Sequence, residues 1–265
     1  MNQKSNWVGY RNFIVDRREP ESETVTSFYL IPEDGADLPT YLPGQSLGFA
    51  IDVPGQKRPV ARNYTISDSP KNAGYYRVSI KRELAPEDKP DVSAGIMSNF
   101  FHDNIAAGAR VKVRAPSGQF VLRPEGKGPV LLLSGGVGCT PMIAMLRAIV
   151  EARSSRKVWY VHGVQNGRQH AFGSHIRSIA AAHENVFAHI CFSRPEQSDS
   201  LGVDYDSAGH VTTDLLRELL PDCLFQVFMC GSTPFMKSLY SGLIDLGFDE
   251  FQIVYEFFGK ASRLK

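Results

Sequence analysis

The sequence predicts two domains, an antiparallel β-barrel followed by an α/β domain built on a doubly wound parallel sheet. Residues 7–122 hold short runs rich in β-branched and aromatic residues, each followed by Pro, Gly or Asp. From residue 130 onwards, short apolar runs alternate instead with helical patterns. The segment 124–129, Pro-Glu-Gly-Lys-Gly-Pro, separates the two patterns and is a plausible hinge. We therefore expect a β-barrel domain over 1–124 and an α/β domain over 125–265.

The first domain is expected to contain six short strands and one helix. The predicted strands are 10–16, 24–31, 46–53, 64–67, 75–82 and 110–115. Strands of this length, separated by turns, favour a closed antiparallel barrel. The helix candidate covers 95–102, where either Ser98 caps the helix or Gly95 begins its first turn.

The second domain is expected to alternate strands and helices. The predicted strands are 130–133, 158–161, 186–192, 225–229 and 253–258, and the predicted helices are 142–152, 170–182, 212–220 and 234–246. Short, continuous apolar runs are typical of strands that a parallel sheet buries on both faces.

The stretch 131–141 is the centre of the functional argument. An apolar run leads into three glycines within four residues, and Thr140-Pro141 then opens an amphipathic segment. This pattern predicts a strand, a tight turn and a helix, whose free N–H groups favour an anion such as a diphosphate. The turn is not the G-x-G-x-x-G fingerprint, so an ordinary tight connection is the alternative. Cys230-Gly231 repeats the arrangement at the carboxyl end of a later strand, where α/β sheets bind ligands.

Three further segments carry candidate binding groups. Strand alternation puts Arg62 and Tyr64 on one face, which sets a guanidinium able to grip phosphate beside an aromatic ring. The start of the helix at 95–98 is a second candidate phosphate site. The segment 255–259 offers aromatic rings and a carboxylate. The alternatives are, respectively, a surface arginine beside a half-buried tyrosine, a capped turn and a hydrophobic strand end.

Composition narrows the class of protein. The 265 residues are 43% hydrophobic and 22% charged, and the net charge of +1 gives no reason to expect nucleic acid as a partner. Without a long apolar stretch or a signal-peptide core, we expect a soluble, cytoplasmic chain with no membrane insertion. The four cysteines are too dispersed for a C-x-x-C pair or an iron–sulfur ligand set, so we expect thiols and no metal.

The ordered set of motifs resembles a known family. Arg62-x-Tyr-Thr, Gly95-x-x-Ser, Gly135-Gly-x-Gly-x-Thr-Pro and Cys230-Gly resemble the signature of the ferredoxin-reductase superfamily of FAD/NAD(P)H oxidoreductases. Segments 41–45, 76–83, 97–102, 170–172 and 255–259 resemble, more narrowly, the reductase portion of flavohemoglobins. The resemblance covers nearly the whole chain. Because only six residues precede Trp7, we expect the globin half to be absent. Ser232 and Lys260 depart from the family pattern, which has proline at both positions.

The resemblance implies a role for each matching residue. FAD would be contacted by Tyr41, Arg62, Asn63, Tyr64, Thr65, Ile80, Gly95, Met97 and Ser98. The nicotinamide dinucleotide would be contacted by Gly135, Gly136, Val137, Gly138, Cys139, Thr140, Pro141, Cys230 and Gly231. Phe258, between Phe257 and Gly259, matches an aromatic residue that shields the flavin, and Glu256 matches an acid beside it. Tyr64, Thr65, Cys230, Glu256 and Phe258 are the implied residues of the reacting centre.

The implied function is an FAD-containing reductase that takes a hydride from NAD(P)H and passes electrons singly to a separate protein acceptor. Arg194 follows the third strand of the second domain and could meet the 2′-phosphate of NADPH, whereas Glu196 and Asp199 would repel it. NADH is therefore the expected coenzyme and NADPH the alternative. A free flavin or ferric reductase, a non-catalytic redox sensor and a fold-mate without flavin stay open. The motifs specify neither the acceptor, which a globin, cytochrome, ferredoxin or oxygenase component would fit, nor the oligomeric state.

Overall fold

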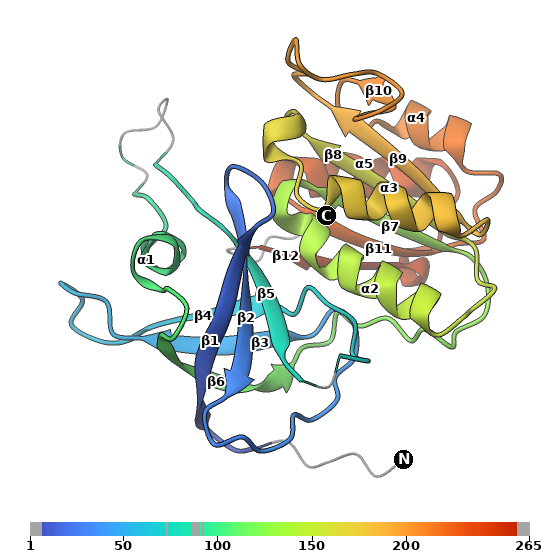
Figure 1. The fold of residues 1–265 in the computed structure, drawn as a ribbon. Coiled ribbons are helices and arrows are strands. Elements are labelled where there is room, and N and C mark those ends of the chain that lie inside the picture. Colours follow the sequence, from blue (N-terminus) through green and yellow to red (C-terminus); the bar gives the residue numbers. More distant parts are fainter. Residues whose placement is uncertain (1–6, 73, 86–90, 92, 259–265) are drawn as a thin grey trace. The chain divides into compact units, whose positions relative to one another are not determined.

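The computed structural model describes residues 7–72, 74–85, 91 and 93–258. The chain divides between Leu122 and Arg123 into two compact units. We call them the barrel unit and the sheet unit, and Figure 1 colours them blue to green and green to red.

The barrel unit contains a six-stranded antiparallel sheet in the order β4-β3-β6-β1-β2-β5. The strands are β1 (Tyr10–Pro20), β2 (Val25–Pro32), β3 (Ser46–Ile51), β4 (Val60–Thr65), β5 (Tyr76–Lys81) and β6 (Arg110–Ser117). The two edge strands meet where Ile66, which follows β4, forms a bridge with Val78 of β5. The Ser67 N–H adds a bond to the Arg77 carbonyl at 2.8 Å. The predicted closed antiparallel barrel is confirmed.

Strand β4 begins four residues earlier than the sequence predicts. The segment from Val60 to Asn63 follows Pro59 and ends in two polar residues, so it lacks the pattern of a strand. Pairing with β3 along its whole length, from Val60 opposite Ile51 to Thr65 opposite Ser46, makes it a strand. Tertiary pairing therefore outweighs local propensity here.

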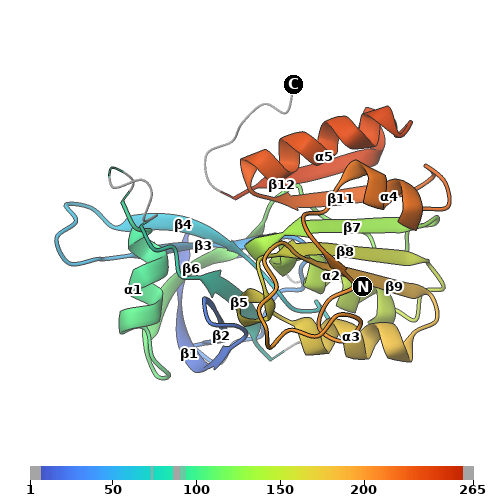
Figure 2. The same cartoon turned by 90° about the horizontal axis from the view of Figure 1, so that it is seen from above.

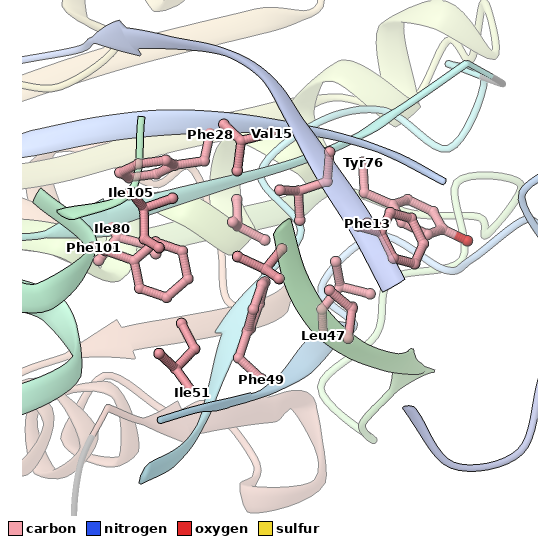
Figure 3. Close-up of a cluster of buried hydrophobic side chains, with 14 of the residues drawn as sticks. Phe13, Val15, Phe28, Leu47, Phe49, Ile51, Tyr76, Ile80, Phe101 and Ile105 are labelled. Atoms are coloured by element: carbon pink, nitrogen blue, oxygen red, sulfur yellow. The ribbon is translucent and has the colours of Figure 1, made fainter. Parts of the chain in front are cut away.

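The core of the barrel unit is aromatic and holds the helix α1 (Ile96–Asn104) against the strands. Phe101 of α1 is fully buried, and its ring lies edge-on to Phe28 of β2 at 5.2 Å and to Phe49 of β3 at 5.4 Å. Figure 3 shows these rings together in the cluster. One helix residue thus fixes α1 to two strands, with Ile105, just beyond the helix, in the same cluster.

The sheet unit contains a six-stranded parallel sheet in the order β10-β9-β8-β7-β11-β12. Its strands are β7 (Val130–Gly135), β8 (Val158–Val164), β9 (Val186–Phe192), β10 (Ser207–Ala208), β11 (Gln226–Gly231) and β12 (Ile253–Phe257). Its helices are α2 (Cys139–Glu151), α3 (Gly173–Ala182), α4 (Thr213–Leu219) and α5 (Thr233–Asp245). Figure 2 shows α2 and α3 on one face of the sheet and α4 and α5 on the other. The predicted doubly wound parallel sheet is confirmed.

Helix α3 begins three residues later than predicted. Phe172 takes a left-handed conformation (φ 63°) at the N-cap, and residues 167–169 form a separate 3₁₀ turn. The segment before α3 therefore turns twice before the helix begins, which periodicity alone does not reveal.

The segment that joins the two units is fastened to the sheet unit by Arg156, a buried residue just before β8. Its guanidinium donates to the carbonyls of Gly128 (2.7 Å) and Arg123 (3.2 Å) and to the side chain of Gln226 (2.9 Å). Two acceptors on the joining segment and one on β11 thus hold one charged group in place. In the part of the chain that the structure describes, no helix is long and apolar enough to cross a membrane.

Candidate functional site

Arg62 and Tyr64 lie on the same face of β4, as strand alternation predicts. They stand opposite Phe49 and Leu47 of β3, both of which are core residues. The Tyr64 ring packs edge-on against Phe49 at 5.7 Å and Phe101 at 5.6 Å. Arg62 is exposed, and its guanidinium donates to the carbonyl of its neighbour Ala61 at 2.7 Å. The ring is thus fixed by packing, while the guanidinium faces solvent.

The start of α1 lies near Tyr64. Gly95 is the N-cap, and its N–H donates to the Glu83 carbonyl at 2.8 Å. A side chain at Gly95 would collide with Ser98, whose hydroxyl donates to the Gly95 carbonyl at 3.2 Å. Burial raises the pKa of the Tyr64 phenol, the Arg62 charge opposes that shift and the Glu83 charge adds to it. Because Tyr64 also packs against Phe101 of the same helix, an arginine, an aromatic ring and α1 lie in one neighbourhood.

Other residues assigned to the flavin lie deeper in the barrel unit. Tyr41, Ile80 and Met97 are at most 5% exposed, and the Tyr41 hydroxyl donates to the Asp68 carbonyl at 2.8 Å. Thr65 is also buried, whereas Asn63 is exposed on the face opposite Tyr64. A flavin contact from Ile80 or Met97 would therefore involve the main chain or the floor of the site.

The turn after β7 winds directly into α2. Residues 136–138 form a 3₁₀ turn, with Gly136 at φ 54°, and the Thr140 hydroxyl donates to the Val137 carbonyl at 3.1 Å. Residues 135–137 reach the surface, but Gly138 and the following Cys139, Thr140 and Pro141 are buried. A side chain at Gly138 would collide with the Cys230 carbonyl, so this glycine is required by the close approach of β11. Gly136 therefore allows the left-handed turn, whereas Gly138 leaves room for the main chain of β11.

Four polar side chains form a row across the sheet, one register step before the carboxyl ends of β7 and β11. Glu256 of β12 pairs with Cys230 of β11, which pairs with Ser134 of β7, which pairs with His162 of β8. Cys230 is fully buried. Burial raises the pKa of Glu256 to about 7, and burial followed by the Glu256 charge raises that of Cys230 well above its usual range. Cys230 is therefore a neutral thiol beside a carboxyl group that titrates near neutrality.

His162 is a member of this row that sequence reasoning missed. Its Nδ1 lies 2.9 Å from the Ser134 hydroxyl, and its ring stacks on His170 at 5.4 Å. Burial lowers the pKa of His162 to about 3 and that of His170 to about 4, so both are neutral at physiological pH. His162 directly follows the apolar run 158–161, and a histidine that continues a buried strand was the available signal.

Charged side chains gather where β8 and β9 end. Arg194 is exposed, and its N–H donates to the Gln165 carbonyl at 2.8 Å. Glu196 accepts from the Arg168 Nε at 3.1 Å and from the Asn166 amide at 3.0 Å. Asp199 accepts from the main-chain N–H of Glu196 at 2.7 Å. Both acids are thus already bonded within the unit, and Arg168 is a charge that sequence reasoning missed.

The C-terminal candidates end the described chain. Phe257 lies opposite Gly231 in β11, and Phe258, just after β12, is 40% exposed. Gly259 lies outside the described residues. All four cysteines are free thiols. Among the described residues, no three His, Cys, Asp or Glu side chains form a metal-binding group.

Comparison with known proteins finds a different domain family in each of the two units. Residues 12–122 match the oxidoreductase FAD-binding domain, and residues 132–240 match the oxidoreductase NAD-binding domain. The solved structure of the flavohem-like FAD/NAD binding domain of nitric oxide dioxygenase from Vibrio cholerae is similar, with a TM-score of 0.83 and 31% identity. That likeness covers 94% of this chain and 99% of the Vibrio chain. The structure of Malassezia yamatoensis flavohemoglobin with bound FAD and haem shares the fold, with a TM-score of 0.80 at 21% identity over 97% of this chain and 62% of its own.

Full-length relatives are longer than this chain. The flavohemoprotein of Bacillus thuringiensis subsp. konkukian is 38% identical over 263 residues, which are 99% of this chain. The chain spans 64% of the length of that relative.

Proposed function

Because the chain belongs to the flavohemoglobin-like FAD/NAD-binding oxidoreductase domains, we propose that it oxidises NADH through FAD and delivers electrons singly to a haem protein. The observation that carries this proposal is the likeness to the Vibrio domain along nearly the whole of both chains. FAD supplies the redox chemistry, since it accepts a hydride and releases single electrons, while the protein supplies binding and alignment.

The barrel unit fits the flavin. We assign Arg62 to the FAD diphosphate, because its guanidinium is exposed and a planar guanidinium binds phosphate in a bidentate manner. The N–H groups at the start of α1 can donate hydrogen bonds to the same anion. The Tyr64 ring, fixed by Phe49 and Phe101, offers a flat surface to the isoalloxazine, with Thr65 as its neighbour.

The sheet unit fits the nicotinamide dinucleotide. The turn 135–138 lies at the switch point between β7 and β11, where α/β sheets bind nucleotides outside their strand ends. Cys230 and Gly231 end β11 on the other side of this point. Glu256, with a pKa of about 7, can hold or release a proton close to Cys230 at physiological pH. We assign to Phe258 the role of the aromatic residue that shields the flavin.

The charges at the ends of β8 and β9 favour NADH. The side chains of Arg168 and Arg194 carry two positive charges, and those of Glu196 and Asp199 carry two negative ones. Because Glu196 is paired with Arg168, a 2′-phosphate would have to displace an existing ion pair. The 2′-hydroxyl of NADH is uncharged and leaves that ion pair intact.

Anaerobic mixing of the purified holoprotein with NADH or NADPH tests the proposal. We expect NADH to bleach the flavin absorbance in a stopped-flow experiment, and a ferric globin to be reduced at higher kcat/KM than free FMN or a ferric chelate. Faster reduction of free FMN would identify a flavin reductase instead. A yellow protein that NADH does not bleach would identify a sensor, and a colourless one would remove FAD from the account.

A further inference from the structure

Three glycines at the ends of three neighbouring strands surround one aromatic ring. A side-chain carbon at Gly135, the last residue of β7, would have as its three nearest neighbours ring atoms of Phe235, at 3.0, 3.0 and 3.2 Å. At Gly231, the last residue of β11, it would lie 2.7 Å from the same ring, and at Gly163 of β8 it would lie 3.9 Å away. The Phe235 ring therefore occupies the space that side chains at Gly135 and Gly231 would fill, whereas at Gly163 it is only in ordinary van der Waals contact and Val211 is the nearer neighbour.

The position of this ring follows from the topology of the sheet unit. Phe235 belongs to the first turn of α5, which follows β11 on one face of the sheet, while α2 follows β7 on the other face (Figure 2). Chains that leave adjacent strands in opposite directions open a crevice between them. Phe235 is half-buried, so it contacts the strand ends and also faces solvent.

The order of the strands indicates which half of a dinucleotide reaches the ring. The charged residues that would flank the adenosine ribose follow β8 and β9, and the diphosphate turn follows β7. Phe235 lies further along the same edge, between the ends of β7 and β11. A dinucleotide laid along the edge in this order places its nicotinamide riboside beside Phe235.

We propose that the Phe235 ring forms the floor of the nicotinamide-riboside site, and that Gly135 and Gly231 are glycines because the ring needs their space. This inference rests on the proposed NADH site and deepens it. An apolar ring offers a flat surface to the nicotinamide riboside without competing for the hydrogen bonds of the carboxamide. Gly138 differs, because its close neighbour is the main chain of Cys230 and not this ring.

A mutant cycle in the FAD-loaded protein tests the assignment, with NAD⁺ and ADP-ribose as probes. Phe235→Ala should raise the Kd for NAD⁺ about tenfold and leave the Kd for ADP-ribose unchanged, since ADP-ribose lacks the nicotinamide. Phe235→Tyr keeps the ring and should bind NAD⁺ like the unmodified protein. Phe235→Leu, which keeps an apolar contact without an aromatic face, should fall between the two and guards against a folding defect in the alanine variant.

The glycine variants test whether a side chain at Gly135 acts by displacing the Phe235 ring. Gly135→Ala should weaken NAD⁺ binding on its own, because its methyl group displaces the ring, and should add no further loss once Phe235→Ala has removed the ring. Gly138→Ala is the matched control: it should be harmful in both backgrounds, since its collision is with main-chain atoms.

Two results would overturn the inference. One is a Phe235→Ala protein that binds NAD⁺ as tightly as the unmodified protein, and the other is an equal loss from Gly135→Ala with and without the ring. Failure of the proposed function is distinguishable, because the unmodified protein would then neither bind NAD⁺ nor be bleached by NADH.

Discussion

Burial sets the protonation state of the polar side chains near the ends of the central strands. Glu256 is desolvated enough to titrate near pH 7, while His162 and His170 are desolvated enough to stay neutral. The row therefore contains one group that changes charge at physiological pH, and it is the carboxyl group beside Cys230. Carboxyl groups with raised pKa values are common at sites that move protons.

Replacing Glu256 by glutamine should change how stability depends on pH. The folded-state pKa of about 7 lies above the ordinary value of 4.5, so the contribution of Glu256 to stability is complete below about pH 4.5 and is lost as pH rises through 7. As pH rises from about 5 to about 8, the unfolding free energy of the unmodified protein should therefore fall by about 2 kcal/mol relative to that of Glu256→Gln, after allowing for partial exposure. Urea unfolding at both pH values checks this, and a constant difference between the two proteins would contradict it.

Coenzyme preference is predicted to depend on one ion pair. Glu196→Gln removes the negative charge that would repel a 2′-phosphate beside Arg168, so the ratio of kcat/KM for NADPH to that for NADH should rise roughly tenfold. Asp214→Asn is a matched control, because it also removes a carboxylate that pairs with an arginine, Arg217, but on the exposed surface of α4. A similar rise in both variants would point to net charge and not to a local site.

Helix α1 is held to the barrel by edge-on aromatic contacts. The Phe101 ring touches Phe28, Phe49 and Tyr64, which come from three different strands. The same ring therefore supports both the proposed phosphate site at the start of α1 and the proposed flavin surface on β4.

Removing that ring should weaken both the fold and the flavin site. Phe101→Ala should cost about 3–5 kcal/mol of unfolding free energy, the usual range for a fully buried phenylalanine. Phe251→Ala is the control, since Phe251 is 84% exposed and should cost almost nothing. Denaturant unfolding and the FAD content of the purified proteins provide the measurements. Full FAD retention by a destabilised Phe101→Ala protein would show that α1 is not needed for the flavin.

Sequence patterns predicted the type and order of every helix α1–α5 and every strand except the two-residue β10, because apolar periodicity reflects burial directly. They missed the start of β4, whose strand character comes from pairing with β3, and they missed His162, Arg168 and Phe235. Each of these three acts through a neighbour distant in sequence: Ser134 for His162, Glu196 for Arg168 and Gly135 for Phe235. Such pairs depend on strand register and helix placement, which local patterns do not specify.

The chain as a whole consists of two units with separate cores, joined through a short segment that Arg156 fastens to the sheet unit. The Arg156 guanidinium reaches the carbonyls of Arg123 and Gly128 at the two ends of that segment. The connection is therefore ordered by hydrogen bonds to a charged group, which contribute more than neutral ones.

Arg156→Met should loosen this connection. Loss of the three charged hydrogen bonds should raise the rate of tryptic cleavage after Lys127 about tenfold, because cleavage follows the population of the locally open form. The neighbouring exposed residue provides the control Lys157→Met, which should leave that rate unchanged. Mass spectrometry of the fragments identifies the cut, and equal rates in the two variants would show that the segment is held by something else.

The contact between Gly138 and the carbonyl of Cys230 has an evolutionary consequence. Side chains can be trimmed or enlarged by mutation, but main-chain atoms cannot, so position 138 is restricted to glycine as long as these two turns keep their spacing. Adaptation to a coenzyme with a 2′-phosphate can instead proceed through Arg168 and Arg194, whose side chains are exposed beyond the ends of β8 and β9.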